Sequence, residues 1–305
     1  MLTYTVISGA LELGFIYSLV ALALFISFHI LNIADMTTDG AFTLGCAVSA
    51  TAAAGGHPFL GIILAMLSGV AAGFVTAFLQ TKCGIQSILA GIITNIGLYT
   101  INLAVMGFSS NVSLIGTGTV FTAARDLLGK GSPYKLILAL AVSLIVCTLI
   151  VLFLGTRIGL SIRATGDNPD MVRASSVNTS MTITVGLCIA NAITALSGAL
   201  LAQYQKTADI NLGTGMVIIG LASLIIGQTL FAKFPLKVRA FGVIVGSVIY
   251  RFIIAVALKM NLPSEALKLI SAVIVAAAIS MPTLQKRIAS SLRRRRLKKE
   301  DAEDA

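Results

Sequence analysis

Residues 135–155 read KLILALAVSLIVCTLIVLFLG, and no charged residue follows Lys135 within this run. A helix of this length rises about 1.5 Å per residue and therefore matches the ~30 Å hydrocarbon core of a bilayer. A helix also satisfies its own backbone hydrogen bonds, which lipid cannot do for a loop or an open sheet edge. The run therefore predicts a transmembrane α-helix.

Similar apolar runs fill most of the chain. Hydrophobic residues make up 57% of the sequence and charged residues only 11%, against about 25% charged residues in soluble domains. The composition predicts an all-α, polytopic integral membrane helical bundle with about 8–10 transmembrane helices in one domain, residues 1–285. Nine runs are counted: 5–30, 40–55, 59–80, 86–107, 135–155, 180–203, 214–232, 240–259 and 266–284.

The remaining residues, 286–305, form a basic and then acidic tail. The net charge is +10, and the tail holds many of the basic residues. A basic run directly after an apolar segment is typical of a cytoplasmic flank at anionic headgroups, so we expect lipid contact and no nucleic acid. Counting back from a cytoplasmic tail places 156–178 inside, 108–134 and 204–213 outside, and the N-terminus outside.

The second run, 40–55, is the shortest, and Asp35 and Asp39 precede it. This pattern favours a broken or partly re-entrant helix buried among other helices. Residues 34–36 (Ala-Asp-Met) also resemble residues 208–210 (Ala-Asp-Ile), and glycines follow both. An inverted repeat of the kind found in transporters explains this similarity, and so does chance.

Side chains suited to catalysis or metal binding are scarce. The four cysteines lie singly in apolar runs, and the chain has only two histidines, so we expect no catalytic residue, metal site or cofactor. The chain also lacks a Gly-x-x-x-x-Gly-Lys-Ser/Thr phosphate loop, because residues 129–132 lack the upstream glycine. If ATP drives this protein, another polypeptide has to bind it.

The most polar interruption in the middle of the chain is the loop 159–178. Asn168 is a good helix N-cap, Pro169 suits the first helical position, and Asp170 lies where the helix dipole favours an anion. Residues 169–177 are therefore predicted to form a short helix on the cytoplasmic surface. An ordinary capped loop and a docking element for a soluble motor subunit both fit this pattern.

The loop residues 163–169 (Arg-Ala-Thr-Gly-Asp-Asn-Pro), followed by 171–174 (Met-Val-Arg-Ala), resemble the cytoplasmic loop of ABC importer permeases of the branched-chain amino acid and ribose type. Residues 13–21 and 31–45 also resemble that family. The Asn-Ile-Ala-Asp and Asp-Gly-Ala-Phe segments within 31–45 resemble a subfamily associated with binding lipoproteins for tryptophan or tyrosine.

The resemblance implies a permease fold in which the loop forms a coupling helix that seats in the ATPase subunit. Carried onto this chain, the coupling residues are Arg163, Gly166, Asp167, Asn168, Pro169, Asp170, Met171 and Arg173. The implied assembly is a homodimer of permeases with two ATPase subunits and an external substrate-binding lipoprotein. It would lie in a bacterial inner or plasma membrane, with the C-terminal tail in the cytoplasm.

Polar residues within the apolar runs are candidates for the translocation pathway, because leaving them in hydrocarbon is costly. For Asp39, a pathway role and a cap at the start of the second span are both possible. Glu12 and Arg251 are expected to pair across the bundle, and Asn191 and Gln228 also suit interhelical hydrogen bonds. The full candidate set is Asp39, Asp35, Asn95, Asn191 and Gln228.

The function predicted from these features is that of the permease subunit of an ABC importer. An amino acid, possibly aromatic, is the favoured solute, and nucleosides, sugars and vitamins are alternatives. A secondary transporter or channel remains the competing class, although few titratable groups are available for ion coupling. An intramembrane enzyme would need a nucleophile, a dyad or a metal cluster, and the sequence offers none.

Overall fold

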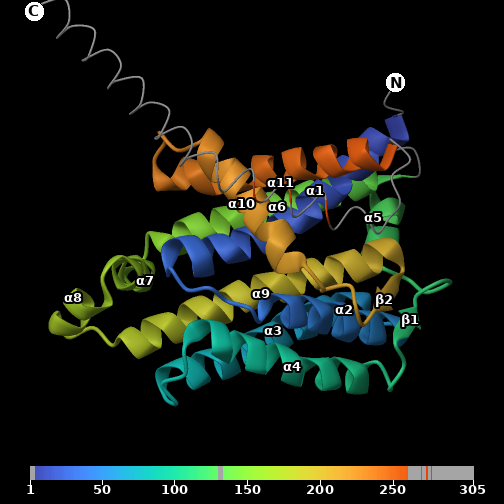
Figure 1. Cartoon of the computed structure of the whole chain (residues 1–305). Helices are drawn as coiled ribbons and strands as arrows, with labels where there is room; N and C mark the ends of the chain where they lie inside the picture. The colour runs from blue at the N-terminus through green and yellow to red at the C-terminus, as the bar shows by residue number, and fades with distance from the viewer. Residues whose placement is uncertain (1–3, 130–132, 260–268, 270–272, 274–275, 277–305) are drawn as a thin grey trace, which may run out of the picture.

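The computed structural model describes residues 4–129 and 133–259, together with 269, 273 and 276. Most of these residues are helical (Figure 1). In chain order the elements are α1 (Tyr4–Leu24), the π-helix η1 (Phe25–Ile30), α2 (Thr38–Ala54), α3 (Pro58–Thr81), α4 (Ser87–Val105), β1 (Asn111–Ser113), α5 (Val120–Leu128), α6 (Tyr134–Leu154), α7 (Arg157–Asp167), α8 (Pro169–Ala174), α9 (Thr179–Gln205), β2 (Thr207–Asp209), α10 (Met216–Leu230) and α11 (Leu236–Lys259).

Six helical segments in the described residues are long and apolar enough to cross a membrane. They are Val6–Ile30, Pro58–Thr81, Ser87–Val105, Tyr134–Leu154, Thr179–Gln205 and Leu236–Leu258. Helices α2 and α10 occupy the predicted runs 40–55 and 214–232, but with 17 and 15 residues they are shorter than these six segments. The ninth run, 266–284, and the tail fall outside the described residues apart from three isolated positions. The predicted polytopic helical bundle is confirmed.

Helix α9 lies at the centre of the bundle. In its most apolar stretch 83% of the residues are buried, whereas only 22% are buried in the corresponding stretch of α6. Helix α9 packs against α1, α2 and α3. The close approach depends on small residues: a Cβ on Gly69 or Gly73 of α3, or on Gly45 of α2, would collide with the α9 backbone. Small residues are the usual means of packing helices in lipid, where hydrophobic expulsion does not drive association.

The chain is interrupted between α1 and α2. Helix α1 ends in the π-helix η1, a rare conformation that is frequent at functional sites. Residues 31–37 are irregular, with Asn32 at a positive φ of 56°, and Asp35 and Thr37 within them are buried. The predicted break therefore lies before the second helix, and α2 itself is continuous.

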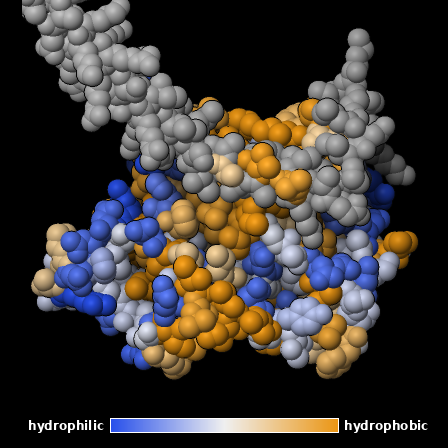
Figure 2. All heavy atoms as spheres, viewed as in Figure 1, coloured by the Kyte–Doolittle hydropathy of each residue, from blue (hydrophilic) through white to orange (hydrophobic). Residues whose placement is uncertain are grey.

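The two ends of the bundle differ in what they carry. The short helices α7 and α8 and the α10–α11 turn lie at one end, and α5, β1 and β2 lie at the other (Figure 1). Strands β1 and β2 pair antiparallel with Val112 opposite Ala208, so the segments 108–129 and 204–213 meet at this end of the bundle. Figure 2 shows apolar atoms across the middle of the face in view and hydrophilic atoms toward both ends.

Candidate functional site

The loop at the α7–α8 end forms the predicted helix, although it is shorter than expected. Asn168 caps α8, and its side-chain oxygen accepts from the backbone N–H groups of Asp170 and Met171, each at 3.1 Å. The helix ends at Ala174 and not at residue 177, because the chain turns at Ser176, which has a φ of 61°.

Helix α8 has one buried side and one open side. Val172 is only 3% exposed, whereas the neighbouring Met171 is 61% exposed. Arg173 lies 3.6 Å from Asp170 and donates from Nε to the Thr179 hydroxyl at 3.0 Å, which ties α8 to the start of α9. Asp170 and Met171 are thus presented outward on a helix held to the bundle by Val172 and Arg173.

Helix α7 joins this exposed loop to the transmembrane helices. Gly166 lies so close to Ile30 that a Cβ at position 166 would collide with the Ile30 carbonyl oxygen. The Thr165 and Thr182 hydroxyls are 2.9 Å apart, and Asp167 is exposed where α7 ends. Arg163 lines a hollow of about 270 Å³ with residues of α6 and α11.

Asp39 links the beginnings of two short helices. Its carboxylate oxygens accept from the backbone N–H groups of Gly215 and Val217, each at 2.9 Å, at the N-terminus of α10. Thr43 accepts from the Gly213 N–H at 3.1 Å. The first N–H groups of a helix have no intrahelical acceptor, and Gly215 has no side chain to supply one. Asp39 therefore caps α10 and not its own helix, which was the alternative drawn from the sequence.

A hollow of about 460 Å³ opens beside Asp39. Asn95 and Asn102 of α4 approach Gly40, and Asn102 donates to the Gly40 carbonyl at 3.2 Å. At about 1.5 Å per residue Asn95 lies about 12 Å along α4, near its middle, and Asn102 lies about 22 Å along it, near its C-terminal end. The lining residues are Asp39, Gly40, Thr43, Asn95, Ile96, Tyr99, Thr100, Asn102, Ile210, Asn211 and Thr214.

Sequence reasoning found Asp39 and Asn95 of this hollow but not Tyr99, Asn211 and Thr214. Tyr99 lies one turn after Asn95 on α4, and this i, i+4 spacing was a usable signal. Asn211 and Thr214 closely follow the second copy of the repeat, residues 208–210. No pattern in the sequence indicated that this copy would lie beside α4.

Asp35 and Asn191 meet away from the hollow. The Asn191 amide donates to the Asp35 carboxylate at 2.7 Å, and the Thr37 N–H donates to the same carboxylate at 2.9 Å. Both side chains are buried, at 3% and 1% exposed, and neither is among the residues lining the hollow. The contact fastens the irregular segment 31–37 to the central helix α9.

Gln228 lies at the opposite end of α10 from Asp39. Its side-chain oxygen accepts from Nε of Arg239 at 2.6 Å, and the Arg239 guanidinium lies 2.9 Å from Nε2 of His29. This chain of three side chains, named here the inner bridge, joins α10, α11 and η1. Nothing in the sequence predicted that His29 and Arg239 would meet.

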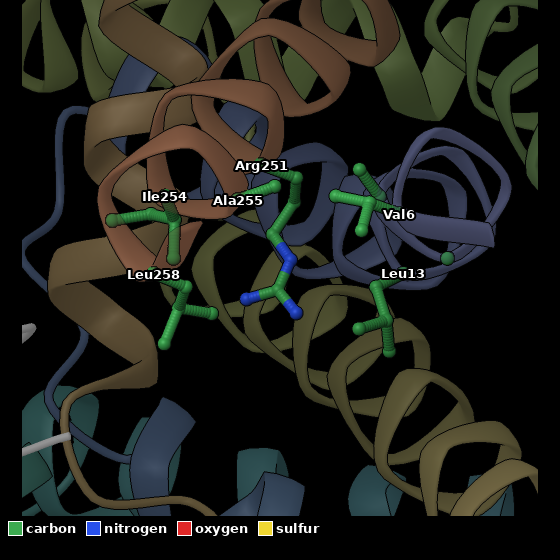
Figure 3. Close-up of a pocket in the computed structure, with 8 residues that line it drawn as sticks. Val6, Leu13, Arg251, Ile254, Ala255 and Leu258 are labelled. Carbon is green, nitrogen blue, oxygen red and sulfur yellow. The ribbon is translucent and has the colours of Figure 1, made fainter. Parts of the chain in front are cut away.

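The expected pairing of Glu12 with Arg251 is wrong. Glu12 accepts from the hydroxyls of Ser8 at 2.9 Å and Tyr204 at 2.7 Å. Arg251 lies 4.6 Å above the Tyr17 ring, where the π-electrons attract a cation. It borders an apolar hollow of about 380 Å³ between α1 and α11 (Figure 3). Two hydroxyl donors and an aromatic face thus replace the predicted ion pair.

Comparison with known proteins places the chain in a family. The family profile described as "Branched-chain amino acid transport system / permease component" matches residues 6–279. A tyrosine transport system permease protein of Clostridioides difficile (strain R20291) is 38% identical over 270 residues, covering 88% of each chain. An uncharacterized protein of Rickettsia prowazekii (strain Madrid E) is 32% identical over 275 residues, covering 89% of this chain and 95% of its own.

Among solved structures, PsaBC from Streptococcus pneumoniae in complex with Fab aligns with a TM-score of 0.38 at 11% identity. That alignment covers 81% of this chain and 88% of the other. The profile match spans α2, α4 and the α7–α8 loop, and each of the two relatives covers almost nine-tenths of the chain. The chain is therefore a multi-pass membrane protein that belongs to the branched-chain amino acid type of ABC transport system permeases.

Proposed function

We propose that this permease is the transmembrane subunit of an ABC importer whose solute is an amino acid and whose ATP is hydrolysed by a separate subunit. The observation that carries the proposal is the α7–α8 unit. It presents Met171 and Asp170 outward on a capped helix, and Gly166 holds the same unit against the end of η1. An exposed apolar side chain beside a charge suits docking to a soluble partner.

The hollow beside Asp39 is the proposed translocation pathway. Its polar side chains include the amides Asn95 and Asn211 and the hydroxyls Tyr99 and Thr214, while the Asp39 carboxylate is engaged by α10. Neutral donors and acceptors can form hydrogen bonds with the charged groups of a zwitterion without binding it as tightly as a full countercharge would. A tyrosine permease among the relatives supports an aromatic amino acid as the solute.

The proposed assembly contains two copies of this permease, two ATPase subunits and an external binding lipoprotein. In this arrangement the α7–α8 end faces the cytoplasm and the β1–β2 end faces the binding protein. The domain boundaries, 1–285 for the permease and 286–305 for a cytoplasmic tail, belong to the same proposal. ATP binding would draw the ATPase subunits together and displace the α7–α8 units, which opens and closes the hollow alternately.

The test is co-expression with a candidate ABC ATPase subunit from the same organism, followed by purification through the permease. We expect the ATPase to copurify, and Met171→Glu to reduce its recovery by placing a charge in the docking surface. Ile115→Glu is the matched control, because Ile115 is 82% exposed at the opposite end of the bundle. Full recovery of the ATPase after deletion of residues 166–177 would overturn the coupling role.

Uptake is measured on the same preparations in proteoliposomes containing the binding protein. Labelled tyrosine is the first solute to test, followed by other amino acids. Uptake should require ATP on the side of the membrane that carries the ATPase subunits. Uptake driven by an ion gradient without ATP would instead favour a secondary transporter, and free equilibration without either would favour a channel.

A further inference from the structure

Helix α10 is held by polar contacts at both of its ends. At its N-terminus, the Asp39 carboxylate accepts hydrogen bonds from the backbone N–H groups of Gly215 and Val217, and the Thr43 hydroxyl accepts one from the Gly213 N–H. Three residues of the segment that leads into this terminus, Ile210, Asn211 and Thr214, line the hollow. A displacement of α10 along its axis therefore has to move one wall of the hollow relative to α2 and α4, or break these hydrogen bonds.

At its C-terminal end, α10 is joined through the inner bridge to η1. Gln228 accepts from Arg239, and Arg239 contacts His29. A guanidinium only donates hydrogen bonds, so Nε2 of His29 is the acceptor in this contact. Among the described residues Arg239 has no ion pair with a carboxylate. Its two partners are neutral, and the bridge can break and re-form without separating opposite charges.

The π-helix that carries His29 also touches the α7–α8 unit. The residue after His29, Ile30, has its carbonyl against Gly166 of α7. Leu31 follows, and a Cβ on Gly186 of α9 would collide with its side chain. A π-helix forms i→i+5 hydrogen bonds in place of the i→i+4 bonds of an α-helix, and it is rare because it is less stable. The end of α1 can therefore shift at η1.

We propose that α10 transmits movement of the α7–α8 unit to the hollow, with Arg239 as the positioning residue that couples it to η1 and Asp39 as its anchor at the other end. The inference rests on the proposed function, because it assumes that a partner subunit displaces α7 and α8. The helix itself is a rigid link of about 22 Å, at about 1.5 Å per residue. Movement would enter through Gly166 and Ile30 and leave through residues 210–214.

The experiment reports the state of the hollow through a cysteine at Thr214, which is exposed and lines it. Thr214→Cys is introduced with Cys83→Ser, because Cys83 is the exposed native cysteine. The complex of permease and ATPase subunit is reconstituted, and the rate of maleimide labelling is measured without nucleotide and with ATP plus vanadate. We expect vanadate trapping to change the labelling rate in this parent complex.

Variants of the inner bridge then test the coupling. Arg239→Gln and His29→Leu should abolish the nucleotide-dependent change in labelling while the ATPase subunit still copurifies. His29→Gln should retain the change, because the glutamine oxygen can accept from Arg239. Lys233→Gln removes the same charge at an exposed position in the α10–α11 turn and should also retain it.

The outcomes separate this inference from the function it rests on. If the labelling rate of the parent complex is the same without nucleotide and with ATP plus vanadate, the ATP-driven function and the inference are both overturned. A normal nucleotide response in both Arg239→Gln and His29→Leu would overturn the inference alone. Loss of ATPase copurification in these variants would also overturn it, since the bridge would then serve assembly and not transmission.

Discussion

Asp39 had two possible roles from its sequence context, one in the translocation pathway and one as a cap on its own helix, and the second prediction is wrong. It lines the hollow and at the same time caps a helix, but the capped helix is α10, far along the chain. Each carboxylate oxygen accepts one backbone N–H. Removing such a cap costs about 0.5–2 kcal/mol. The part that would be destabilised is the start of α10, beside the wall of the proposed pathway.

Replacing Asp39 by alanine should therefore impair transport more than assembly. We expect Asp39→Ala to lower the rate of ATP-dependent uptake in proteoliposomes, with Asp39→Asn in between because it keeps one acceptor oxygen. The amount of copurified ATPase should stay unchanged. Asp126→Ala, which alters an exposed residue of α5, is the control. Unimpaired uptake by Asp39→Ala would remove Asp39 from the pathway.

Gly166 is the residue through which α7 touches η1, and its lack of a side chain permits the contact. Gly166→Ala would place a methyl group against the Ile30 carbonyl, and overpacking of this kind costs about 1–3 kcal/mol. Gly97→Ala on α4 is the matched control, because nothing lies within 4 Å of its added Cβ. Thermal unfolding in detergent should show a lower midpoint for Gly166→Ala and an equal or higher one for Gly97→Ala.

At the scale of elements, α8 is too short to be stable alone, because it has six residues and depends on its cap. Asn168→Ala should remove about 1 kcal/mol of helix stability. Hydrogen exchange should then speed up at the amides of residues 170–174, and ATPase copurification should weaken. Thr119→Ala, which uncaps α5 at the other end, should loosen α5 without affecting the ATPase. Equal ATPase recovery in Asn168→Ala would show that docking does not require an ordered α8.

At the scale of the whole molecule, the arrangement of loops predicts a definite orientation. The α3–α4 turn with Cys83 lies in a segment predicted to be cytoplasmic, whereas Ile115 follows β1 at the opposite end. In intact cells an impermeant maleimide should label Ile115→Cys, made in a Cys83→Ser background, and should leave native Cys83 unmodified until the membrane is permeabilised. The reverse pattern would invert the proposed topology and exclude the cytoplasmic role of α7 and α8.

The sequence by itself determined the membrane class, the eight described helical runs and the capped α8, since all of these depend on local apolarity and local hydrogen bonds. Asn168 illustrates this, because its two acceptor contacts reach only two and three residues along the chain. The break near Asp35 was also visible, although its position before α2 was not.

Only the tertiary structure decided which distant groups meet. Asp39 caps α10, Arg239 reaches His29, and Glu12 accepts from Tyr204 in place of an ion pair with Arg251. Apolar periodicity identifies which residues are buried in lipid or protein, but it does not specify which helix faces which. In a membrane those pairings follow from the close packing of small residues and from polar groups seeking partners, and both are properties of the assembled bundle.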